Sequence, residues 1–79
     1  NPSTKIHYNI SKSMNIKISV IDMMGREVKT LLNEHQEPGL KTIEWDGKNE
    51  KGESLASGVY LYQITSTEFY KTNKMIFLK

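Results

Sequence analysis

The sequence of 79 residues contains no cysteine, only two prolines and two histidines, and no long hydrophobic run. The absence of cysteine excludes disulfide bonds, thiolate metal ligands and a thiol nucleophile, but it does not define the cellular compartment. No apolar run exceeds four residues, the length of the run at 75–78, which is far short of the ~20 residues that cross a bilayer as a helix. We therefore expect no membrane span.

Neither sign of charge predominates in the sequence. Eleven Lys and Arg residues stand against nine Asp and Glu residues, which gives a formal net charge of +2. No basic stripe with interleaved aromatic residues is present, so a nucleic-acid partner is not predicted. The length predicts one small domain over residues 1–79. Because the chain lacks an initiator Met and a signal segment, we expect it to be a piece of a longer polypeptide.

Alternation of apolar and polar residues predicts two strands in the first part of the chain, over 4–10 and 14–22. In the first strand, Ile6, Tyr8 and Ile10 share one face. The second strand places Met14, Ile16, Ile18 and Val20 inward, and Asn15, Lys17 and Ser19 outward. Residues 11–13 form the predicted turn between them.

The middle of the chain is less regular. Residues 22–26 read as a tight turn with Gly25 at a position of positive φ. Residues 26–36 carry apolar residues at helical spacing, but they lack a helix cap, so we favour a strand over 27–32. Residues 33–39 are predicted to be a polar loop that ends in a Pro-Gly turn.

Three further segments complete the predicted fold. Strands are expected over 40–45, 59–65 and 69–78, with a turn at 66–68. About seven short strands with turn signals between them predict an all-β protein, an antiparallel β-sandwich of the immunoglobulin-like type.

Residues 45–60 predict a long connection that crosses from one sheet to the other. The connection begins at Trp45 and contains Gly47, Gly52 and Gly58, where the backbone can adopt positive φ. Tyr60 enters a strand directly after it. We expect its hydroxyl to bond to upstream backbone, as in a tyrosine corner.

Four oxygen-bearing side chains within this connection allow two interpretations. They are Asp46, Asn49, Glu50 and Glu53. A bent loop of this kind can hold calcium, but the spacing differs from an EF-hand, and Lys48 and Lys51 would oppose a cation. The alternative, which we favour, is a polar turn in which Asp46 and Asn49 bind backbone amides, with no metal.

No residue pattern supports catalysis or a cofactor. His7 is expected on a solvated strand face, and neither it nor His35 has a further ligand at metal-binding spacing. The serines at 11, 13, 54, 57 and 66 lie in predicted turns without a neighbouring base. We therefore expect no enzyme.

The aromatic residues could form either a core or a sugar-binding platform. They are Trp45, Tyr60, Tyr62, Tyr8, Tyr70, Phe69 and Phe77. Their alternate strand positions favour the core, with Trp45 buried and Tyr70 left on the surface.

Several motifs together resemble one family. They are Asn1 to Tyr8, Asp22 to Val28, Trp45-Asp46-Gly47, Gly52, Ala56 to Tyr60, and Lys74 to Lys79. In order and spacing they resemble the C-terminal sorting domains (type A) of the type IX secretion system. A structural relative of that family is the immunoglobulin-like domain of flagellar hook-capping proteins.

The resemblance implies a non-catalytic sorting and anchoring module, a monomer joined covalently to a larger cargo protein. Its partner would be the outer-membrane secretion machinery, and its destination the cell surface or the medium, by way of the periplasm. The implied recognition segment is Lys74, Met75, Ile76, Phe77, Leu78 and Lys79. The implied scaffold positions are Gly25, Trp45, Asp46, Gly47, Gly52, Gly58 and Tyr60. The ending at Lys79 suggests the C-terminus of the parent protein, which would count against the flagellar relative. The alternative is an accessory immunoglobulin-like or carbohydrate-binding module of a secreted glycan-degrading enzyme.

The last strand is apolar on both faces, with Ile76 and Leu78 on one and Met75 and Phe77 on the other. A strand that only closes a sandwich needs one apolar face. We expect the Met75–Phe77 face either to be covered by upstream chain or to be free for a partner. In the second case, Phe77→Ser would reduce export more than it reduces stability.

Overall fold

The computed structural model describes residues 3–79, and in this range it contains six β-strands and no helix. The strands are β1 (Thr4–Ile10), β2 (Met14–Ile21), β3 (Glu27–Gln36), β4 (Gly39–Trp45), β5 (Gly58–Thr65) and β6 (Tyr70–Phe77). The prediction of an all-β antiparallel immunoglobulin-like sandwich is confirmed, with six strands in place of about seven. Asn1 and Pro2, which begin the first motif of the resemblance, lie outside the described residues.

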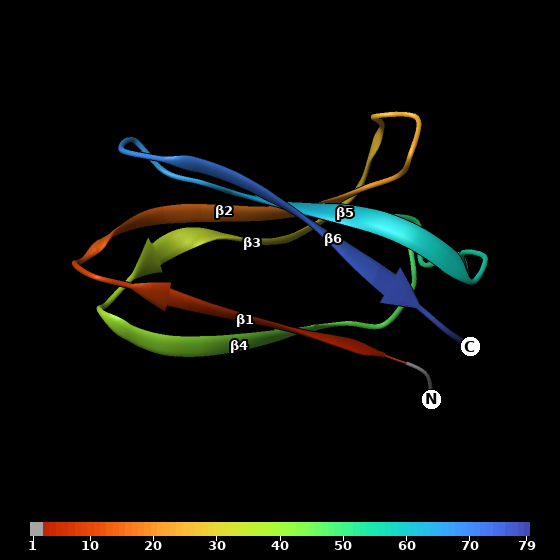
Figure 1. The fold of residues 1–79 in the computed structure, drawn as a ribbon, viewed down its shortest axis with the longest axis horizontal. Coiled ribbons are helices and arrows are strands. Elements are labelled where there is room, and N and C mark those ends of the chain that lie inside the picture. The colour runs from red at the N-terminus through yellow and green to blue at the C-terminus, as the bar shows by residue number, and fades with distance from the viewer. Residues whose placement is uncertain (1–2) are drawn as a thin grey trace.

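The six strands form two sheets, one of two strands in the order β1-β4 and one of four strands in the order β3-β2-β5-β6. Every pairing is antiparallel. Figure 1 shows the two sheets as separate layers, with β4 joined to β5 by the segment that follows Trp45. Residues 46–57 therefore cross from one sheet to the other, as the sequence predicted.

Strand β3 extends four residues beyond its predicted end. Residues 33–36, predicted to be a loop, pair with residues 17–14 of β2, and Gln36 lies opposite Met14. Their polar side chains do not prevent pairing, because β3 is an edge strand whose side chains can remain in water. The helical alternative for residues 26–36 is wrong, because pairing with β2 holds this segment in an extended conformation.

The core between the sheets consists of two groups of buried side chains. One comprises Ile6, Val20, Trp45, Met75 and Phe77. The other comprises Ile10, Ile16, Ile18 and Ile64. The inward residues predicted from the alternation in β1 and β2 are thus confirmed at Ile6, Ile10, Ile16, Ile18 and Val20.

Ser19 departs from the alternation, because it was predicted outward and is only 3% exposed. It lies on β2 opposite Thr30 of β3 and Gln63 of β5. A strand with neighbours on both sides has the outer face of its central residues covered by adjacent side chains. The Ser19 hydroxyl is hydrogen-bonded to the Glu27 carboxylate, and this bond is the main reason that the pKa of Glu27 is lowered.

Candidate functional site: the C-terminal segment and its scaffold

Trp45 ends β4 and is fully buried. The edge of its ring meets Tyr60 at a centroid distance of 4.9 Å and an interplanar angle of 70°, and Phe77 lies 5.1 Å away. The indole Nε1 donates a hydrogen bond to the carbonyl of Lys48 at 3.0 Å, so its single polar group is satisfied. Trp45 thus joins β4, β5 and β6 at one end of the sandwich.

Gly47 provides the space for Phe77. It has a φ of 78°, and a Cβ built at this position would overlap the aromatic ring of Phe77. A side chain at position 47 would therefore displace the strand that carries the predicted recognition segment. This close approach explains why glycine occupies position 47 in the Trp45-Asp46-Gly47 motif.

The far end of the crossing segment is held by Tyr60. Its hydroxyl donates a hydrogen bond of 2.7 Å to the carbonyl of Ala56, four residues upstream, which confirms the predicted tyrosine corner. The amide of Leu55 donates to the carbonyl of Gly47 at 2.8 Å. The two ends of the segment are therefore drawn together across its base.

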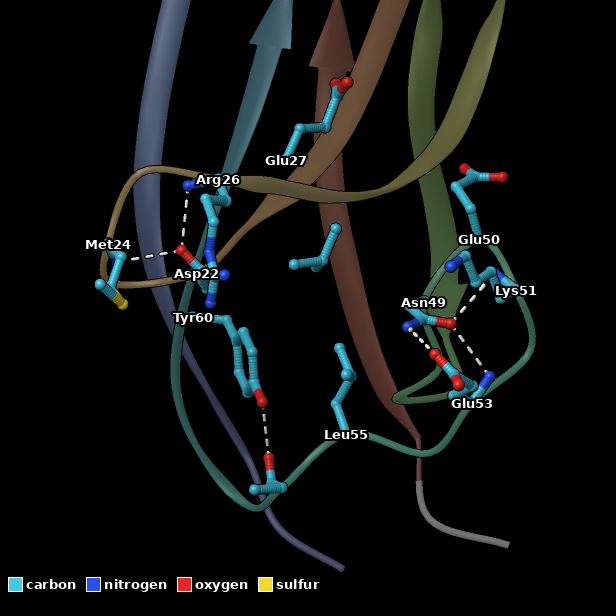
Figure 2. Close-up of a pocket in the computed structure, with 12 residues that line it drawn as sticks. Asp22, Met24, Arg26, Glu27, Asn49, Glu50, Lys51, Glu53, Leu55 and Tyr60 are labelled. Atoms are coloured by element: carbon cyan, nitrogen blue, oxygen red, sulfur yellow. Dashed lines mark hydrogen bonds and ion pairs between the residues drawn. The ribbon is translucent and has the colours of Figure 1, made fainter.

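The polar residues of the crossing segment bind backbone amides, as the favoured interpretation predicted. Asn49 Oδ1 accepts hydrogen bonds from the amides of Lys51 and Glu53, each at 3.0 Å (Figure 2). Asp46 Oδ1 accepts from the amide of Lys48 at 3.2 Å. These oxygens organise the turn. Among residues 3–79, no three His, Asp or Glu side chains are grouped as metal ligands would be.

Glu50 attaches the crossing segment to β3. Its amide donates to the carbonyl of Val28 at 3.1 Å, and its carboxylate accepts from the amide of Thr30 at 2.7 Å. β3 is an edge strand, so these bonds satisfy backbone groups that would otherwise be free to pair with another chain.

A cleft of about 670 Å³ lies between the crossing segment and the turn at residues 22–26 (Figure 2). Its acidic groups are engaged locally. Asp22 accepts hydrogen bonds from the amides of Met24 and Arg26, each at 2.9 Å, and pairs with the Arg26 guanidinium at 2.9 Å. The bond from the Arg26 amide is the main cause of a lowered pKa at Asp22. This carboxylate is held ionised by its own turn, and Gly25 has the predicted positive φ of 88°.

The C-terminal segment presents a different face from the one expected. Met75 and Phe77 point into the core, and Phe77 is 1% exposed, whereas Ile76 and Leu78 are 61% and 71% exposed. Of the two alternatives for the Met75–Phe77 face, the one that left it free for a partner is therefore wrong, because both side chains pack in the core with Trp45. The expectation that Phe77→Ser would reduce export more than stability is wrong for the same reason, since it removes a core side chain. The tail is held where the amide of Lys79 donates to Ser57 Oγ at 2.9 Å. Nothing local in the sequence marked Ser57 for this contact, since the two residues are distant in the chain.

The two histidines and the serines keep separate, local contacts. His7 is exposed as predicted, with Nδ1 3.1 Å from Thr42 Oγ1, and His35 lies 3.5 Å from Glu37. The hydroxyl of Ser13 donates to Glu37, and that of Ser66 accepts from the amides of Glu68 and Phe69. In the described chain no serine hydroxyl is hydrogen-bonded to a histidine.

The aromatic residues mainly fill the core, as favoured. Trp45 and Phe77 are fully buried, and Tyr8, Tyr60 and Tyr62 are half-buried. Tyr70 is on the surface, as predicted, and Phe69 is partly exposed beside it. Within residues 3–79, no helix is long and apolar enough to span a membrane.

Two antiparallel sheets, a buried tryptophan and a tyrosine corner define the chain as an immunoglobulin-like β-sandwich. A family model described as the FlgD Ig-like domain matches residues 3–68, and the chain belongs to this family. The crystal structure of FlgD from P. aeruginosa is similar, with 26% sequence identity and a TM-score of 0.74. The similarity covers 95% of this chain but only 59% of that chain. No curated protein matches the sequence.

These findings support the coarser part of the resemblance. The chain shares its family with the FlgD Ig-like domain and its fold with the FlgD structure. Its recognition segment, its partner and its destination remain predictions.

Proposed function

We propose that this chain is a non-catalytic sorting and anchoring module that directs a covalently attached cargo protein through a type IX secretion system to the cell surface. The observation that carries the proposal is the exposed apolar pair Ile76 and Leu78 at the end of the chain, next to Lys74 and Lys79. Contiguous exposed apolar patches rimmed by polar residues mark protein-binding sites, and we infer that this pair lies at the centre of one.

The scaffold supports this role by holding the segment in one position. Phe77 is fixed between Trp45 and Gly47, and Ser57 holds the amide of Lys79. Because the odd-numbered side chains anchor the strand, Ile76 and Leu78 are presented outward with little loss of entropy on binding. The proposed partner is the outer-membrane secretion machinery, reached from the periplasm by a monomeric domain that needs no cofactor.

The experiment separates recognition from stability. A reporter is fused ahead of this chain and expressed in a bacterium with a type IX system. The double variant Ile76→Ser with Leu78→Ser should lose most surface delivery and collect in the periplasm. Its melting temperature should change little, because substitutions at exposed positions usually alter stability by less than about 0.5 kcal/mol.

Met23→Ser is the matched control, since Met23 is 63% exposed, close to the 61% of Ile76, and lies in the turn at residues 22–26. It should leave delivery unchanged. Deletion of residues 74–79 is unsuitable, because it also removes the core side chains of Met75 and Phe77. Normal surface delivery of the double variant would overturn the proposal.

The similarity to FlgD favours a second candidate, an internal module of a hook-capping type protein. A FlgD chimera in which this chain replaces the matching immunoglobulin-like domain would test it in P. aeruginosa. Restored hook assembly, together with no surface delivery of the reporter fusion, would favour this candidate over the sorting role.

A further inference from the structure

β1 and β6 form an open seam between the two sheets. Each is an edge strand: β1 pairs with β4 and β6 pairs with β5 in the described chain. They approach at one end of the molecule, where Thr4 Oγ1 lies 3.5 Å from the carbonyl oxygen of Ile76 (Figure 1). Further along, toward Ile10 and Tyr70, a cleft separates them.

The free edge of β6 can be assigned from its turn. The amide of Ser66 donates to the carbonyl of Phe69 at 2.9 Å, which makes these residues a hydrogen-bonded pair. Antiparallel pairs alternate between hydrogen-bonded and non-hydrogen-bonded, so the backbone groups of Tyr70, Thr72 and Lys74 point away from β5. The contact of the Ile76 carbonyl with Thr4 of β1 agrees with this assignment.

The cleft beside this edge has a volume of about 580 Å³. Tyr8 of β1 and Tyr62 of β5 line its inner side, and Phe69 and Lys71 lie toward β6. A second hollow, of about 560 Å³, shares His7, Tyr8, Asn9 and Lys71 with the first and continues across β1 to Leu40 and Lys41. Together they form one groove, which we name the seam groove.

Two lysine side chains line the seam groove, while the carboxylates of Glu34 and Glu37 act on Tyr8 and on Lys41 from outside its lining. The lysines are Lys41 and Lys71, and no Asp or Glu of residues 3–79 is among the lining residues. Glu68, in the turn beside it, is paired with Lys12 at 2.9 Å. The groove thus combines aromatic walls, cationic side chains and a strand edge with free amides and carbonyls.

We propose that the seam groove accepts an extended acidic peptide segment of another protein, which adds as a strand along the free edge of β6. Free backbone groups on alternate residues match an extended peptide, and a side chain on every second guest residue can enter between Tyr8 and Tyr62. Lys41 lies opposite Tyr8, and Lys71 is two residues from Asn73, which lies opposite Tyr62, so both lysines share the inner face with the two tyrosines. The guest therefore presents acidic and apolar side chains on the same face, two residues apart, with the acidic ones toward Lys41 and Lys71. This site lies apart from Ile76 and Leu78 and does not depend on the sorting role.

The test uses the purified 79-residue chain and synthetic hexapeptides whose positions 1, 3 and 5 share one face and carry both glutamate and an apolar residue (Val, Ile, Phe or Tyr), with threonine at positions 2, 4 and 6. Binding is followed by NMR through the amide shifts and hydrogen exchange of Tyr70, Thr72 and Lys74. Glutamate peptides should bind and slow exchange at these amides. Matched peptides with lysine in place of glutamate, or with N-methylated backbones, should not.

Lys71→Glu should weaken binding about fivefold to tenfold, the effect expected when one ion pair is replaced by repulsion. Lys48→Glu makes the same change of net charge away from the groove and should alter binding less than about twofold. If no glutamate peptide protects the three amides, or if Lys71→Glu binds as tightly as the parent chain, the proposal is wrong. Binding of an acidic oligosaccharide without binding of any peptide would also overturn it.

Discussion

At Gly47 the missing side chain leaves the room that the ring of Phe77 occupies. Another residue could adopt the positive φ of Gly47 at a modest cost in free energy. Its Cβ would still overlap the ring of Phe77. Gly52 provides the comparison, because it has nearly the same φ of 81° and no atom within 4 Å of a built Cβ. The two positions therefore separate backbone strain from steric overlap.

Gly47→Ala should destabilise the domain more than Gly52→Ala. A left-handed backbone costs about 1–2 kcal/mol for alanine at either position. Overpacking against Phe77 should add about 1–3 kcal/mol at position 47 only. Urea unfolding of both variants measures the difference, and equal losses would show that Phe77 moves aside freely.

Trp45→Ala should cost about 3–5 kcal/mol, the range for removing a large buried aromatic side chain. A domain this small has a stability near the lower end of about 5–15 kcal/mol, so the variant should be largely unfolded at 25 °C. Near-UV circular dichroism and thermal melting report the change, with Leu40→Ala as the exposed control. A Trp45→Ala variant that melts within a few degrees of the parent would contradict the burial of the indole.

At the scale of the element, residues 46–57 are ordered although they contain no regular strand. Asn49 is at the centre of this order. Its side chain accepts from two amides and donates to Glu53 Oε1 at 2.9 Å, while its own amide donates to the carbonyl of Glu53. The side chain replaces the backbone partners that a sheet would have supplied.

Asn49→Ala should lower the free energy of unfolding by about 1 kcal/mol, because two exposed amides lose their intramolecular acceptor and must bond to water instead. Hydrogen exchange at Lys51 and Glu53 should accelerate, while exchange in β2 should follow only the global change. Asn33→Ala, an exposed substitution on β3, is the control. Unchanged exchange at Lys51 and Glu53 would mean that other contacts hold the segment.

At the scale of the whole molecule, three carboxylates in different parts of the fold have lowered pKa values, each mainly through a hydrogen bond. The principal donors are the Arg26 amide for Asp22, the Ser19 hydroxyl for Glu27 and the Ser13 hydroxyl for Glu37. Each bond favours the ionised form in the folded state. Their combined effect links stability to pH.

The melting temperature should fall as pH decreases below about 4, where unfolded Asp and Glu begin to take up protons. The sign follows from the lowered folded-state pKa values: the stabilisation is complete above the unfolded values and is lost as pH falls through the folded ones. Asp22→Asn keeps an acceptor oxygen but removes one titration. The melting temperature of this variant, measured between pH 7 and 2.5, should therefore fall less steeply as the pH decreases. An unchanged slope would exclude Asp22 as a contributor.

The sequence by itself determined the strands, most turns and the closing contacts of the crossing segment. Alternation at Ile6, Ile10, Ile16 and Ile18 is a local property, and a half-buried strand can bury only every second residue. The tyrosine corner at Tyr60 is also local, since donor and acceptor lie four residues apart.

Only the tertiary structure decided which face of the last strand is buried, how far β3 extends, and that Ser19 is covered by side chains of the adjacent strands. Residues 75–78 are apolar on both faces, so their burial depends on whether Trp45 and Gly47 receive Phe77. Residues 33–36 are polar enough for a loop, and β2 alone holds them extended. The groove between β1 and β6 arises from strands that are distant in sequence, and no local pattern encodes their separation. In each case the deciding contact is made by residues far along the chain, which the physical chemistry of a short segment cannot specify.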